Sequence, residues 1–303
     1  MLRMRLSSTM DSPAGSLPDD PTTAGRLCAI HQPNLFPRLS TLAKLFAADY
    51  WIVLDDVQFA RRDYQHRARL AALGISHQRQ WLTLPTHLPD GRSTLIKEAQ
   101  LADPDRSRRR IAHMLSQNYG RSRYWPVLRS KLGAVTGKFA ATDKTAVVAE
   151  ASTRLLLELL SWKGQILRSS EFNVRADRSL RLADLALATN ASGYLCGTGG
   201  MKYLRTEPFN TRRVAVIAFH TPVDGFWQGA REISALRSLM VHGPDAVAAE
   251  MRRWAENSTS YAVRRNTDGP IGPTSSDAHV DGTSGAEPLL LSPTPASTNS
   301  PMT

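Results

Sequence analysis

The segment from residue 27 to residue 54 constrains the fold of this chain most strongly. Residues 27–30 form a short apolar run, residues 39–49 place apolar side chains at helical spacing, and residues 50–54 are aromatic and β-branched. This order predicts a strand, a helix and a second strand. Because such a connection joins parallel strands through a right-handed crossover, we expect a βαβ unit with two buried, parallel strands.

The alternation of strands and helices continues along the chain. Apolar and β-branched runs predict further strands at residues 81–84, 165–168, 193–196 and 214–219. Helices are expected near residues 106–118, 124–132, 143–162, 179–190 and 244–254. Strands that alternate with helices predict an α/β fold, here a mostly parallel sheet flanked by helices.

Both ends of the chain differ in composition from this body. Residues 1–25 and 257–303 are rich in Ser, Thr, Pro, Gly and Asp. Such segments cannot bury enough apolar surface to offset the entropy cost of ordering, so we expect disordered N- and C-terminal tails. Residues 26–256 contain no internal repeat and are predicted to form one α/β domain.

Composition also limits the class of protein. No apolar run approaches the roughly 18–20 residues that a membrane span needs, and no apolar stretch of signal-peptide type follows the N-terminal arginines. We therefore expect a cytoplasmic protein with no membrane partner. The two cysteines are too few for a disulfide scaffold or a four-cysteine zinc site. No metal site is predicted, because the histidines lack close partners at ligand spacing.

Positive charge is concentrated in the body of the chain. Residues 27–255 carry 33 basic and 19 acidic groups, a net charge of +14, which attracts polyanions or acidic small molecules. Eight of the basic residues lie between residues 106 and 131, close to Tyr119, Tyr124 and Trp125. Basic groups beside aromatic rings can bind RNA, including a tRNA, and a solvated helix face is the alternative.

Polar side chains follow the first two predicted strands. In an open parallel sheet, ligands bind beyond the carboxyl ends of the strands, so the two loops should be neighbours. There a histidine would supply a general base, a carboxylate would orient it, and amides would donate hydrogen bonds to a substrate. Alternatively, the carboxylates cap the next segment and the histidine merely packs. The candidates are His31, Gln32, Asn34, Asp55, Asp56 and Gln58.

A cysteine at the end of a later strand is a candidate nucleophile. Cys196 is followed by Gly197 and Gly199, whose backbone N–H groups could surround an acyl oxygen. A thiolate activated by His31 or His220 would hold an acyl group as a thioester, or serve a hydrolase or cyclising enzyme. The alternative is a small buried side chain beside a turn or an anion-binding nest.

Two other features of these loops bear on anionic substrates. Lys202 lies next to the glycines and could grip a phosphate, whereas the Gly-x-Gly-Gly segment lacks the remaining residues of a nucleotide fingerprint. The cofactor therefore stays unknown. Arg67 belongs to a basic segment, residues 61–69, that would clamp a phosphate or carboxylate if it folded over the site. A plain solvated face is again the alternative.

The motifs resemble those of a known family. Residues 31–70, HQPNLFPRLSTLAKLFAADYWIVLDDVQFARRDYQHRARL, are similar to the opening of the WbqC-like protein family. Four further segments follow in the order of that family: WLTLP at 81–85, YLCGTGGMKYL at 194–204, the strand before His220, and ISALRSLMVHGPDA at 233–246. Three positions depart from the family pattern. Cys196 replaces a serine, residues 66–68 replace an Asn-Arg-Asn segment, and Arg237 replaces an acidic residue.

The resemblance implies a function. WbqC-like proteins are associated with bacterial surface-polysaccharide and secondary-metabolite clusters, and the resemblance implies transfer of an acyl or aminoacyl group, such as glycine, to an amino sugar or similar amine. Our leading hypothesis is such a transferase. His31 acts as base, Asp55 or Asp56 orients it or binds the amine, and Gln58 and Arg67 position an anionic substrate. The alternative is an RNA- or anionic-ligand-binding module without catalysis.

Overall fold

The computed structural model describes residues 25–74 and 78–267, with side chains described through residue 257. All elements below belong to the unit that ends at Thr267. The tails predicted from composition fall mainly at residues 1–24 and 268–303, which lie outside the described residues.

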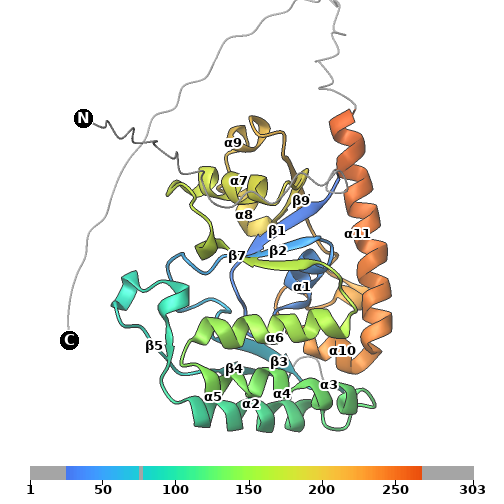
Figure 1. Cartoon of the computed structure of the whole chain (residues 1–303). Helices are drawn as coiled ribbons and strands as arrows, with labels where there is room; N and C mark the ends of the chain where they lie inside the picture. Colours follow the sequence, from blue (N-terminus) through green and yellow to red (C-terminus); the bar gives the residue numbers. More distant parts are fainter. Residues whose placement is uncertain (1–24, 75–77, 268–303) are drawn as a thin grey trace, which may run out of the picture. The chain divides into compact units, whose positions relative to one another are not determined.

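A five-stranded parallel sheet forms the centre of this unit (Figure 1). The strands lie in the order β7-β2-β1-β8-β9, and every neighbouring pair is parallel. Helix α1 connects β1 to β2, which lie side by side, as predicted. The predicted α/β fold is confirmed. The bounds are β1 Leu27–His31, α1 Leu39–Phe46, β2 Tyr50–Val53, β7 Gln165–Arg168, β8 Gly193–Gly197 and β9 Ala215–Phe219.

Side chains of the sheet enter two hydrophobic cores. Ala29, Trp51 and Leu195 belong to the core shared with α1, α6, α10 and α11, whereas Cys28 and Cys196 belong to the core shared with α7 and α9. Because side chains alternate along a strand, adjacent residues of β1 and β8 point to opposite faces of the sheet. The helix bounds are α6 Thr145–Leu159, α7 Arg178–Ala188, α8 Thr198–Met201, α9 Glu207–Asn210, α10 Leu236–His242 and α11 Pro244–Thr267.

A further layer lies beyond α6 (Figure 1). The predicted strand at residues 81–84 is β4, and it pairs antiparallel with β3 outside the parallel sheet. We did not predict β3, because its two arginines interrupt the apolar pattern of the sequence RARLA. The bounds are β3 Arg67–Ala71, β4 Arg79–Thr83, β5 Thr86–His87, β6 Gln100–Leu101, α2 Pro104–Tyr119, α3 Trp125–Lys131, α4 Gly133–Thr136 and α5 Lys138–Ala141. Short 3-10 turns occupy Gly91–Ser93, Ile96–Glu98, Ser169–Glu171 and Gly225–Trp227.

Helix α11 extends farther than composition predicts. It runs to Thr267, past the boundary expected at residue 257. Residues 257–267 contain neither glycine nor proline, which favours a helix over this segment. Among the described residues, neither this helix nor any other is long and apolar enough to cross a membrane.

Candidate active site at the carboxyl edge of the sheet

A pocket of about 350 Å³ lies at the carboxyl ends of β1, β8 and β9. The strand order reverses here, because the chain passes from β1 to β2 on one side and later returns to β8 on the other side of β1. Open α/β sheets bind ligands at such a switch point. The side chains that border the pocket include His31, Arg38, Lys44, His220 and Arg231.

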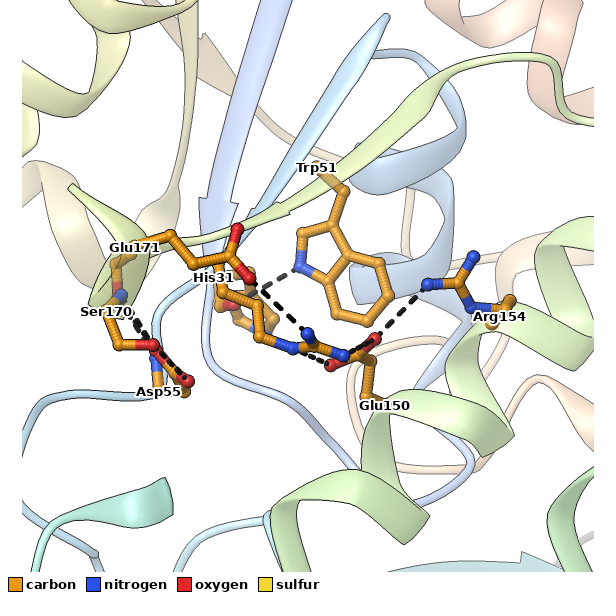
Figure 2. A network of polar contacts seen from close by, with 9 residues as sticks. His31, Trp51, Asp55, Glu150, Arg154, Ser170 and Glu171 are labelled. Atoms are coloured by element: carbon orange, nitrogen blue, oxygen red, sulfur yellow. Dashed lines mark hydrogen bonds and ion pairs between the residues drawn. The ribbon is translucent and has the colours of Figure 1, made fainter. Parts of the chain in front are cut away.

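His31, the last residue of β1, is held by three neighbours. Its Nδ1 lies 3.3 Å from Lys44 Nζ, and its Nε2 lies 3.2 Å from Asn34 Oδ1. Its backbone carbonyl accepts a hydrogen bond from the indole of Trp51 (Figure 2). Burial, followed by the charge of Lys44, lowers the pKa of His31 well below 6.5, so the ring is neutral at pH 7. With Lys44 donating to Nδ1, the proton of the ring sits on Nε2 and faces Asn34.

Lys44 is a buried cation on helix α1. Its side chain is 6% exposed, and its ammonium also donates to the carbonyl of Ile30 at 3.5 Å. Among the described residues, no carboxylate pairs with it. Burial lowers its pKa from 10.5 to about 8. Near neutral pH this lysine can therefore change between its protonated and its neutral form. An unpaired buried lysine at a pocket is a functional-site candidate.

Asp55 and Asp56 lie away from this pocket, beyond the ends of β2 and β7. Asp55 accepts hydrogen bonds from the hydroxyl and N–H of Ser170 and from the hydroxyl of Ser169 (Figure 2). Asp56 accepts from Ser169 and forms an ion pair with Arg181. The structure does not bring these carboxylates to the pocket with the histidine, and Asn34 occupies the place of the predicted orienting acid. Their catalytic roles stay predictions.

Glu150 forms an ion-pair network close to these serines. It is 6% exposed, and its carboxylate accepts from Arg168 at 2.9 and 3.0 Å and from Arg154 at 3.2 Å (Figure 2). Arg168 ends β7 and also pairs with Glu171 at 3.4 Å. The network therefore ties α6 to the edge strand of the sheet.

The thiol of Cys196 lies on the opposite face of the sheet from His31. Cys196 is fully buried with Cys28 and Tyr194, and burial raises its pKa. A side chain at Gly200 would come within 2.7 Å of its sulfur, so the turn closes over the thiol only with glycine there. These are the features of a structural thiol, the alternative that the sequence left open. A nucleophilic role stays a prediction.

Comparisons with known proteins agree with this architecture. The model of the WbqC-like protein family matches residues 32–249, which span most of the sheet and the pocket. The chain belongs to the WbqC-like protein family. The resemblance read from the motifs is thereby confirmed. The uncharacterized protein Rv1507c of Mycobacterium tuberculosis is 24% identical over 196 residues, covering 63% of this chain and 80% of that protein. No solved structure matches the chain significantly.

The pocket of this WbqC-like protein contains part of the predicted site. Gly197, Gly199 and His220 border it together with the histidine of β1. Lys202 does not border it and is exposed. Among the described residues, no cluster of three His, Cys, Asp or Glu side chains could hold a metal ion.

The other predicted substrate-binding residues have partners outside the pocket. Gln32 accepts from the amide of Gln65 at 2.7 Å, and Gln58 donates to the carbonyl of Arg92. Arg67 donates to the carbonyl of Asp63, and its guanidinium lies 4.4 Å from the centre of the Trp81 ring. These contacts fix the loops around the site.

The sequence did not predict three cations that border the pocket, Arg38, Lys44 and Arg231. Lys44 shares one side of α1 with Ser40 and Thr41, at spacings i, i+1 and i+4, whereas the apolar residues of the helix face the core. This polar stripe on a short helix between two buried strands is the pattern from which Lys44 could be predicted as a site residue. Arg38 precedes the helix, and Arg231 lies far along the chain in a segment without a recognisable pattern.

Proposed function

We propose that this WbqC-like protein is an enzyme that transfers an acyl or aminoacyl group from an activated, anionic donor to an amine acceptor. The observation that carries the proposal is the 3.3 Å contact between Lys44 Nζ and His31 Nδ1 at the pocket. An ammonium beside a neutral imidazole is a pair that can take up one proton and release another. The association of this family with polysaccharide and secondary-metabolite clusters supports a setting in such a biosynthesis. We propose a cytoplasmic location for it.

The pair suits the proton changes of this reaction. The amine nitrogen forms a bond to the acyl carbon, and the bond from that carbon to the leaving group breaks. The Lys44 ammonium gives one proton to the leaving group, which frees the lone pair of His31 Nδ1, and the amine nitrogen loses one proton to that atom. The proton then passes from the imidazole to the lysine amine across their contact, which restores both groups.

Product analysis tests the proposal. The full chain would be incubated with aminoacyl-tRNA and acyl thioester donors and with amino-sugar acceptors, and mass spectrometry would detect an acceptor heavier by one acyl residue. We expect product with wild type and a loss of at least 100-fold in rate with His31→Ala, since positioned acid–base groups contribute about 10²–10⁴-fold. Lys163→Met, at an exposed lysine before β7 and outside the pocket, is the matched control. Unchanged turnover in His31→Ala would remove the proposed roles of this pair.

A second candidate function is RNA binding without catalysis. It is favoured by the surface of α2, α3 and the residues around them, where all of the basic side chains from Arg106 to Lys138 are exposed. Residues 103–142 carry nine basic and two acidic side chains, so little of this charge is neutralised locally. A surface of this kind also suits a tRNA that carries an aminoacyl donor to the enzyme.

A further inference from the structure

The cations of the β1–β8 pocket are held by backbone carbonyls rather than by carboxylates. Arg38 donates to the carbonyl of Arg231 at 3.0 Å, and Arg231 donates to the carbonyl of Thr221 at 3.1 Å. Lys44 donates to the carbonyl of Ile30. None of the described residues that border the pocket is acidic. Three positive charges therefore meet at one pocket with their positions fixed and their charge not neutralised within the described part of the chain.

Arg38, which precedes α1, has a hydrogen-bond donor without a partner in the described structure. The guanidinium of Arg38 lies 4.2 Å from the centre of the Tyr64 ring, which holds the planar group in place. Its Nε is buried and has no hydrogen-bond partner in the described structure. A buried donor without a partner costs about 1–3 kcal/mol. A ligand that binds beside Arg38 is the better explanation for a site that bears this cost.

Neutral donors complete the lining. The hydroxyls of Ser40 and Thr41 come from the first turn of α1, and that of Thr198 comes from the start of α8, directly after β8. Hydroxyl and ammonium groups bind single oxygen atoms, and guanidinium groups bind two at once. The pocket therefore presents more donors than the two oxygens of a carboxylate can use.

Charge decides between the two common anions. A carboxylate carries one negative charge, whereas a phosphate monoester carries about 1.5–2 at neutral pH and offers three terminal oxygens. We infer that the pocket binds the phosphoryl group of a phosphorylated substrate, with the rest of that molecule extending from the pocket into solvent. The inference rests on the proposed function, because it names the anionic group of the substrate in the same site. A diphosphate of a nucleotide-linked donor and a simple phosphate ester share this chemistry.

Calorimetry with pyrophosphate tests the inference. The full chain would be titrated with pyrophosphate at pH 7, with acetate as the carboxylate probe. We expect saturable binding of pyrophosphate, at least tenfold weaker binding of acetate, and at least tenfold weaker pyrophosphate binding in Lys44→Met and Arg231→Met, because a charge-assisted hydrogen bond contributes about 1.5–3 kcal/mol. Lys163→Met, at an exposed lysine before β7, removes the same charge outside the pocket and should leave the affinity within twofold.

Equal affinities for the two anions, or pyrophosphate binding that survives Lys44→Met, would overturn the inference. If pyrophosphate binds as expected, uridine diphosphate and glucose 1-phosphate distinguish the two kinds of substrate that could carry the phosphoryl group. Tighter binding of the nucleotide supports a nucleotide-linked donor, and equal binding supports recognition of the phosphoryl group alone. The titration needs no turnover. Pyrophosphate binding without acyl transfer would therefore contradict only the proposed function, and acyl transfer without pyrophosphate binding would contradict only the inference.

Discussion

Lys44 links the proposed chemistry to a cost in stability. Its ammonium is buried without a carboxylate, so the folded state holds a charge that water would solvate better. The folded pKa of about 8 lies below the unfolded value of 10.5. Between these two values the unfolded chain binds a proton that the folded chain does not, so this group makes stability rise with pH in that window. Below pH 8 the full penalty is present.

Replacing this lysine should therefore stabilise the protein while removing function. We expect Lys44→Met to raise the free energy of unfolding at pH 7 by about 3 kcal/mol, which corresponds to the difference between a pKa of 10.5 and one of about 8. The gain should shrink as pH rises from 8 to 10.5. Urea unfolding of wild type and variant at several pH values measures both effects, and Lys202→Met should show neither. A variant that is less stable than wild type at pH 7 would show that the lysine is paired in solution.

The thiol of Cys196 makes a second prediction at this scale. Because it is buried and its pKa is raised, little thiolate is present at neutral pH. We expect iodoacetamide to label this residue slowly in the folded protein and rapidly in urea, as followed by mass spectrometry of peptides. Cys28, whose pKa burial raises to about 12, serves as the internal control. Fast labelling of Cys196 alone would instead support the predicted nucleophile.

At the scale of elements, the loops after β2 and β7 are joined by one buried carboxylate. Asp55 is 6% exposed and accepts from the N–H of Ser170 at 3.1 Å and from its hydroxyl at 2.9 Å. These bonds tie the end of β2 to the turn that follows β7. The carboxylate thus has a structural task that is separate from the chemistry predicted for it.

Substitutions at this position can separate the two roles. Asp55→Ala leaves the serine N–H without a partner and should lower the free energy of unfolding by about 2 kcal/mol. Asp55→Asn keeps an oxygen acceptor and should cost less. Urea unfolding measures both, with the exposed Asp105→Ala as control. Loss of turnover in a stable Asp55→Asn protein would support the catalytic prediction, whereas full turnover would leave only the structural task.

At the scale of the whole molecule, two separate sets of cations within the described residues are candidates for binding anions. One set of cations lies within the pocket at the sheet edge, and the other covers the exposed surface of α2 and α3. The first set is screened little by salt because it is partly buried, and the second set is screened strongly. The two sites should therefore respond differently to ionic strength.

RNA binding tests the exposed set. We expect the chain purified at low salt to retain nucleic acid and to release it as salt rises. Neutralising Arg108, Arg109 and Arg110 to glutamine should reduce the slope of log affinity against log salt by about two, at about 0.7 per single-strand phosphate contact. Arg252→Gln, on the exposed side of α11, is the control. An absorbance ratio at 260 and 280 nm typical of clean protein at low salt would contradict this second function.

The amino-acid sequence by itself determined the five strands of the parallel sheet and the longer helices, because the periodicities of 2 and 3.6 are present locally in the chain. It also determined that His31 lies at the carboxyl edge of the sheet, since the residues at the end of a buried parallel strand reach that edge. Only the tertiary structure decided which side chains meet. Alternation along β8 places Cys196 on the face away from His31, and the reversal at β1 separates the pocket from Asp55.

The tertiary structure also decided that three cations meet at the pocket. A lysine in an amphipathic helix is usually solvated, whereas Lys44 is buried where the end of β8 packs against α1. Its Nζ lies 3.9 Å from the place that a Cβ on Gly197 would take. The contact between Arg38 and Arg231 joins residues 193 positions apart. Burial and long-range proximity follow from how the elements pack, and local sequence patterns do not encode them.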